Sequence, residues 1–102
     1  MKIPAVVLIK GVEWKVKRVW KLQVDGEDCL GSTDSDKREI KIVHGLKGEE
    51  LLDCYLHEYL HAIFFEYGMY HSMSTDISEI ISHNFASELR TNFTIKPRTK
   101  LR

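Results

Sequence analysis

The sequence has few cysteines and no net charge, and each of these shortages excludes a class of protein. Its two cysteines, Cys29 and Cys54, form neither a CxxC pair nor a disulfide framework, so we expect two reduced thiols. Fifteen basic residues balance fifteen acidic ones, whereas a nucleic-acid binder or a polybasic membrane-surface protein normally has a basic excess. The chain also lacks a recognisable secretion signal and any apolar run near the ~20 residues of a membrane-spanning helix. Together these absences predict a cytoplasmic protein.

The remaining composition is that of one small globular domain with a prominent number of histidines. Of 102 residues, 43% are apolar, 29% are charged and five are histidine, which are ordinary proportions for a folded domain apart from the histidines. We expect a single domain over residues 1–92, large enough for one modest core. A basic, weakly ordered tail is expected over residues 93–102.

The first half of the chain has the apolar alternation of β-strands. The predicted strands cover residues 3–9, 12–24 with a bend near Arg18, and 39–43. Between them, Asp25-Gly26 is typical of a hairpin turn and residues 32–37 of a polar loop. Both tryptophans, Trp14 and Trp20, are expected in the core of the sheet.

The second half of the chain changes to helical spacing. Apolar residues recur every three or four positions from Glu49 to Tyr67, and Gly68 is a stop signal. A second helix is predicted from about Thr75 to Thr91. Its apolar stripe is expected to pack on the first helix and consists of Ile77, Ile80, Ile81, Phe85 and Leu89. The predicted fold class is therefore α+β, with a small mixed or antiparallel sheet of about three to four strands packed against two helices.

The first predicted helix contains the pattern HExxH, as His57-Glu58-Tyr59-Leu60-His61. Residues i and i+4 lie one above the other on a helix, so both imidazoles can reach one metal ion. Glu58 then lies beside that ion, where its carboxylate can take a proton from a metal-activated water. The plain alternative is two half-buried histidines and an exposed glutamate on an amphipathic helix.

A hydrolytic zinc ion (Zn²⁺) needs a third protein ligand and an open position for water. Glu79 is the leading candidate because it lies in the second helix, close to the stripe that is expected to face the first helix. Alternatively, Glu79 caps its own helix together with Asp76 as the N-cap. His83, one turn after Glu79, and His71, in the loop between the helices, are the other candidate ligands.

These residues resemble a minimal gluzincin-type zinc metallopeptidase. Segment 56–63, followed by a helix that bears Glu79 and then Asn84-Phe85-Ala86-Ser87-Glu88-Leu89, is similar to the ImmA/IrrE-like and SprT-like proteins of bacteria and phages. The resemblance covers residues 39–90 and implies a zincin-like fold. It implies zinc ligation by His57, His61 and Glu79, with Glu58 as general base. It also implies that the strand at residues 39–43 is the edge strand that borders the cleft.

The predicted function is zinc-dependent hydrolysis of a peptide bond, with Glu58 as general base and general acid. A peptide or protein substrate would pair with the edge strand 39–43 through main-chain hydrogen bonds. Tyr70 and His71 are candidate donors to the oxyanion. The alternative function is a non-catalytic zinc-binding or protein-interaction module, in which the metal or packing alone pins the two helices.

Overall fold

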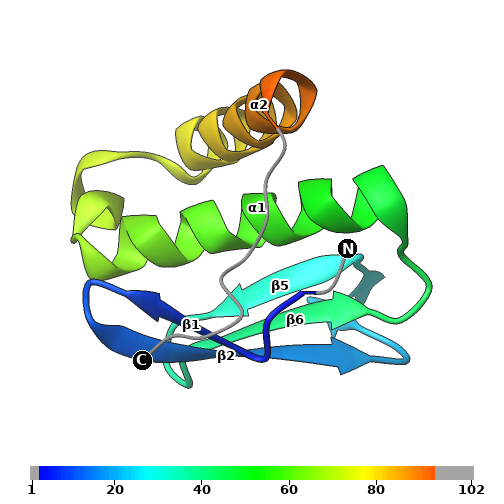
Figure 1. Cartoon of the computed structure of the whole chain (residues 1–102). Coiled ribbons are helices and arrows are strands. Elements are labelled where there is room, and N and C mark those ends of the chain that lie inside the picture. The colour runs from blue at the N-terminus through cyan, green and yellow to red at the C-terminus, as the bar shows by residue number, and fades with distance from the viewer. Residues whose placement is uncertain (1–2, 94–102) are drawn as a thin grey trace.

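The computed structural model describes residues 3–93, apart from the side chains of Tyr70 and His71. Within that range a run of short strands precedes two long helices (Figure 1). The strands are β1 (Val6–Ile9), β2 (Val12–Val19), β3 (Gln23–Val24), β4 (Glu27–Asp28), β5 (Gly31–Asp34) and β6 (Glu39–Val43). The helices are α1 (Gly48–Glu66), the short 3-10 helix η1 (Met69–Ser72) and α2 (Thr75–Asn92). The predicted α+β class is confirmed, and the predicted tail, from residue 94 onward, lies outside the described residues.

The four longer strands form one mixed sheet in the order β1-β2-β6-β5. Strands β2 and β6 pair in parallel, while β1 pairs with β2 and β5 with β6 in antiparallel fashion. The segment 39–43 therefore lies inside the sheet, and the prediction that it forms the edge is wrong. The edge strands are β1 and β5, and β5 lies in a segment that was predicted in large part as a polar loop. Its sequence Gly-Ser-Thr-Asp has no apolar alternation that would indicate a strand. Backbone pairing with β6 holds this segment in place.

Strand β2 runs without the predicted bend. Arg18 takes the next inward-facing position after Trp14 and Val16, where the alternation would place an apolar residue. The pairing of β2 with β6 keeps one register from Lys15 to Val19. The guanidinium group of Arg18 donates hydrogen bonds to the backbone carbonyls of Val43, His44 and Leu46 at 3.0, 3.0 and 3.1 Å. The break in apolar alternation thus reflects one arginine that fastens the loop between β6 and α1.

The core lies between the sheet and α1, and α2 packs on the far side of α1, so the layers run sheet, α1, α2 (Figure 1). Trp14, Ile40 and Ile42 are fully buried on the inner face of the sheet. Trp20 is 86% exposed and stacks on His44 with ring centroids 4.0 Å apart, so its predicted place in the core is wrong. No helix within residues 3–93 combines the length and the apolar character needed to cross a membrane.

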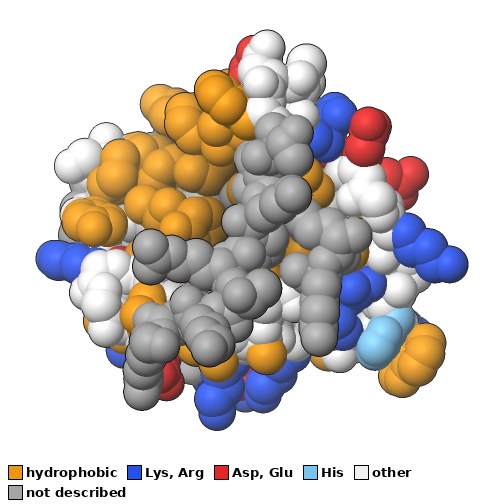
Figure 2. Space-filling model, viewed as in Figure 1, with side chains coloured by type: hydrophobic (Ala, Val, Ile, Leu, Met, Phe, Trp, Pro, Cys, Tyr) orange, Lys and Arg blue, Asp and Glu red, His pale blue; other side chains and the backbone are white. Residues whose placement is uncertain are grey.

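Helix α2 faces α1 with its small side chains and not with its isoleucines. Ser78, Ser82 and Ala86 are buried, whereas the predicted packing residues Ile77, Ile80, Ile81 and Phe85 are 40–60% exposed. The predicted packing face is therefore wrong for these four residues, whereas Leu89, the fifth, packs against the core as expected. Small residues let the two helix backbones approach closely, and the bulky side chains then remain outside, where hydrophobic atoms gather on the surface over the helices (Figure 2).

Glu66 fastens the C-terminal end of α1 to the sheet. Its Oε1 accepts hydrogen bonds from Trp14 Nε1 at 2.9 Å and from Arg38 Nε. The hydrogen bond from Arg38, and then that from Trp14, hold the pKa of the Glu66 carboxyl below its ordinary value. A carboxyl with a lowered folded-state pKa stabilises the fold above its unfolded-state pKa, and this stabilisation is lost as the pH falls through the folded-state pKa.

We expect the Glu66→Gln variant to melt at a lower temperature than the parent at pH 7, because the ionic hydrogen bond to Arg38 is lost. At pH 3 the two melting temperatures should move closer together, since the parent loses the same interaction on protonation. Thermal melts followed by circular dichroism at both pH values measure this. Glu27→Gln, at an exposed position in β4, is the control, and an equal effect at both pH values would contradict the assignment.

Candidate metal centre and cleft

The middle of α1 presents His57 and His61 to the same side of the helix. The two residues are one turn apart, and their Nε2 atoms lie 3.2 Å from each other. The side chain of His61 is 9% exposed and that of His57 is 21% exposed. Burial is the main influence on His61 and lowers its pKa. A lowered pKa favours the neutral imidazole, which is the form that binds metals.

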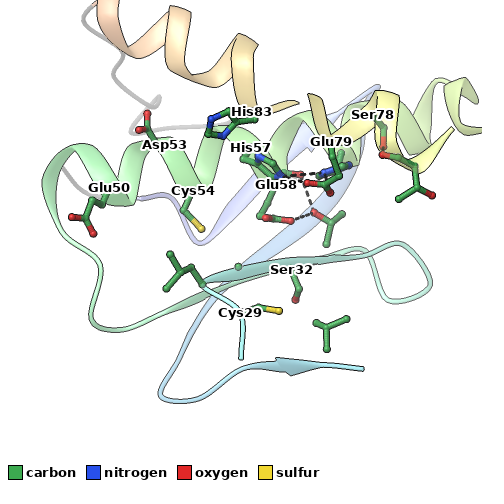
Figure 3. A pocket seen from close by; sticks show the side chains of 16 residues that line it. Cys29, Ser32, Glu50, Asp53, Cys54, His57, Glu58, Ser78, Glu79 and His83 are labelled. Carbon is green, nitrogen blue, oxygen red and sulfur yellow. Dashed lines mark hydrogen bonds and ion pairs between the residues drawn. The ribbon is translucent and has the colours of Figure 1, made fainter. Parts of the chain in front are cut away.

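Glu79 reaches both imidazoles from α2 (Figure 3). Its Oε1 lies 2.8 Å from His61 Nε2, and its Oε2 lies 3.1 Å from His57 Nε2. The predicted alternative, in which Glu79 caps α2 with Asp76, is wrong, because Ser74 is the N-cap and its Oγ accepts from Ile77 N at 3.1 Å. Glu79 lies on the flank of α2 next to the buried Ser78, so the close packing of the helices brings it to the histidines.

The donor set of this cluster fits a zinc ion. The ligand atoms of His57, His61 and Glu79 all lie within 4.8 Å of one another. In a tetrahedral site with bonds of ~2.0–2.1 Å, ligand atoms are separated by about 3.3 Å, close to the 3.2 Å between the two Nε2 atoms. Two imidazoles and one carboxylate leave a fourth position open, as in a catalytic site. The carboxyl side of the cluster is open to solvent, since the Glu79 side chain is 54% exposed.

Glu58 points away from the cluster and toward β5 (Figure 3). It is 9% exposed, and its Oε1 accepts a hydrogen bond from Thr33 Oγ1 at 2.9 Å. Burial raises the pKa of Glu58, and the hydrogen bond from Thr33 and the proximity of His57 offset part of that increase. The structure therefore places a buried carboxylate next to His57 in sequence, held toward β5 and not among the three converging ligands.

Strand β5 lies close to α1 at Gly31. A Cβ atom on Gly31 would lie 2.6 Å from Cys54 Sγ, 3.1 Å from Glu58 Cγ and 3.3 Å from Glu58 Oε2. Gly31 and Thr33 are two positions apart, so both face α1. The narrow space between β5 and α1 thus favours glycine at position 31. A larger side chain there would displace either the strand or the helix.

A cleft of about 940 Å³ runs along this side of α1 and contains the cluster. Its walls come from β5, from α1 and from the first half of α2, and Val24, Cys29 and Leu30 also line it. Burial raises the pKa of the Cys54 thiol at its floor to about 12, which makes this cysteine a packing residue and not a nucleophile.

The other predicted site residues lie outside the cluster or outside the described side chains. His83 lines the cleft one turn beyond Glu79 but is not among the side chains that converge within 4.8 Å. Tyr70 and His71 fall in η1, and their side chains are not described. Thr33 and Gly31 were missed, because a polar segment without alternation carries no signal that it packs against a helix far along the chain.

Comparison with protein-family models, with curated proteins and with solved structures gave no match to this chain. The geometry of the site therefore carries the functional argument.

Proposed function

We propose that this protein is a zinc-dependent peptidase that hydrolyses peptide bonds, with His57, His61 and Glu79 as the zinc ligands. One observation supports this above the others: three potential ligands converge from two helices, while a fourth ionisable group, Glu58, lies buried in the wall of the same cleft and is not one of them. A purely structural zinc site has no use for such a group. A hydrolytic site requires it as general base.

Zinc, when bound, lowers the pKa of a coordinated water toward neutrality and polarises the carbonyl to be attacked. The role of Glu58 is to take the proton that this water releases and to deliver it to the departing amine nitrogen. The raised pKa of Glu58 suits this double role, because a proton carrier works best when its pKa lies near the working pH. Burial against β5 also keeps bulk water from competing for that proton.

The free edge of β5 offers the backbone groups for an extended peptide. Val43 N donates to Leu30 O at 3.0 Å, and the antiparallel register then directs the backbones of Ser32 and Asp34 toward β6. The N–H and C=O groups of Gly31 and Thr33 are left directed away from the sheet. A peptide or protein substrate can pair with these groups by main-chain hydrogen bonds, along β5 and not along residues 39–43 as first expected.

The two free thiols, Cys29 and Cys54, support a reducing compartment, and we place the proposed activity in the cytoplasm. The same geometry supports membership of the gluzincin-type metallopeptidases, since the third ligand is a glutamate of the following helix. The non-catalytic alternative predicts zinc binding and thermal stabilisation without any hydrolysis.

Zinc titration of the metal-free protein against a chromophoric chelator, combined with hydrolysis of a quenched fluorescent peptide library, tests the proposal. We expect one zinc per chain, hydrolysis that strong chelators remove, and recovery of hydrolysis on adding zinc back. Glu79→Gln should weaken zinc binding by more than ~100-fold, above the loss caused by changing a residue that only hydrogen-bonds to a ligand.

Glu88→Gln is the matched control, because Glu88 is an exposed glutamate of the same helix. Within the described residues, its carboxylate accepts a hydrogen bond from Asn92 only. Its zinc affinity and hydrolysis should equal those of the parent. Equal zinc affinity in the two variants would contradict the assignment of Glu79. Stoichiometric zinc without hydrolysis of any peptide would favour the non-catalytic alternative.

A further inference from the structure

The carboxylate of Glu58 lies against two residues of β5. Thr33 Oγ1 is 2.9 Å from Oε1, and Gly31 leaves so little space that a Cβ there would lie 3.3 Å from Oε2. Oε1 is thus hydrogen-bonded to the edge strand, and Oε2 borders the space that a side chain at position 31 would occupy. The orientation of the carboxylate depends on a strand that the HExxH motif does not include.

Thr33 has one hydroxyl proton and two acceptors within reach. Its Oγ1 lies 3.0 Å from the backbone oxygen of Glu58 and 2.9 Å from Glu58 Oε1. The backbone oxygen belongs to the middle of α1, where the N–H of Ala62 is its regular partner. The carboxylate oxygen has no such helical partner, so it is the better acceptor for the hydroxyl proton.

We infer that Thr33 is the positioning residue of Glu58: its hydroxyl holds the carboxylate at the wall of the cleft in the orientation needed for proton transfer. This inference rests on the proposed function. The geometry has a second consequence, because the backbone of the same residue faces the free edge of β5. Peptide capture and placement of the base therefore depend on one residue of the edge strand, and a peptide paired there would also fix β5 against α1.

The test compares Thr33→Val, which keeps the shape but removes the hydroxyl, with Thr33→Ser, which keeps the hydroxyl. On the zinc-loaded protein we expect Thr33→Val to lower kcat by roughly 10–100-fold, which is part of the ~10²–10⁴-fold that general acid–base catalysis contributes, with KM and zinc affinity within about twofold of the parent. Thr33→Ser should restore kcat to within about threefold. A packing role alone would impair Thr33→Ser, which loses the methyl group, more than Thr33→Val, which keeps the shape, and that order would overturn the inference.

A second readout does not depend on activity. In the metal-free protein labelled with ¹³C at glutamate carboxyl groups, the Glu58 signal, identified by its absence in Glu58→Gln, should shift in Thr33→Val and return in Thr33→Ser. An unchanged signal in Thr33→Val would overturn the inference even if the parent hydrolyses peptides. A shifted and restored signal in a parent that hydrolyses nothing would uphold the contact with Thr33 and refute the proposed peptidase.

Discussion

Replacement of Glu58 by glutamine is expected to abolish peptide hydrolysis and to leave zinc binding intact. Glutamine has nearly the same shape and can still accept the hydrogen bond from Thr33, but it cannot take a proton from water. General acid–base catalysis contributes up to ~10⁴-fold, so we expect a loss of at least about 10³-fold in kcat/KM. Zinc affinity should change by less than about threefold, because Glu58 is not among the converging ligands.

The stability of the Glu58→Gln variant provides an independent check. Burial raises the pKa of Glu58, which means that its charged form costs folding free energy at neutral pH. A neutral glutamine removes that cost, so the metal-free variant should melt at the same temperature as the parent or above it. Kinetics, zinc titration and thermal melts on the same preparations measure all three quantities. Hydrolysis within tenfold of the parent would eliminate Glu58 as the base.

The helices and the histidine pair could be predicted from the sequence because they depend on local spacing. A period of 3.6 residues gives α1 within one residue of its observed bounds, and i, i+4 spacing alone brings His57 and His61 together. The position of Glu79 could not be predicted from local spacing, since it depends on how the two helices pack. The prediction placed Glu79 near α1 through the isoleucine stripe, whereas the serine face of α2 is what packs there.

The strand that completes the site could not be predicted, for a physical reason. Periodicity detects strands that bury alternate side chains, but β5 has no large apolar side chain and is held by backbone hydrogen bonds to β6. Its contacts to Glu58 join residues about twenty-five positions apart. Such contacts follow from the order of the strands in the sheet. That order depends on which strand pairs in parallel with β2, and local sequence patterns do not indicate this pairing. The interior place of β6 was missed for the same reason.

A single methyl group on Gly31 is expected to affect both stability and hydrolysis. Gly31 has no left-handed backbone angle, so the conformation of alanine is not the obstacle. The obstacle is space, because its Cβ would lie 2.6 Å from Cys54 Sγ and 3.1 Å from Glu58 Cγ. We expect β5 to move outward, because each atom is one bond beyond its Cβ and can give way only by a change of χ1 rotamer. We expect a loss of about 1–3 kcal/mol in the free energy of unfolding, as for other overpacked sites.

The same outward movement should lower hydrolysis by roughly 100-fold, the effect of a ~1 Å misplacement in an active site. Urea unfolding and peptide kinetics on Gly31→Ala measure the two losses, and Gly45→Ala is the matched control because no atom lies within 4 Å of a Cβ there. Adding Cys54→Ala removes the tightest contact and should restore part of the stability, while the contact with Glu58 persists and keeps kcat low. If Gly31→Ala behaves like Gly45→Ala in both measurements, β5 does not press on α1 in solution, and Gly31 does not set the position of Glu58.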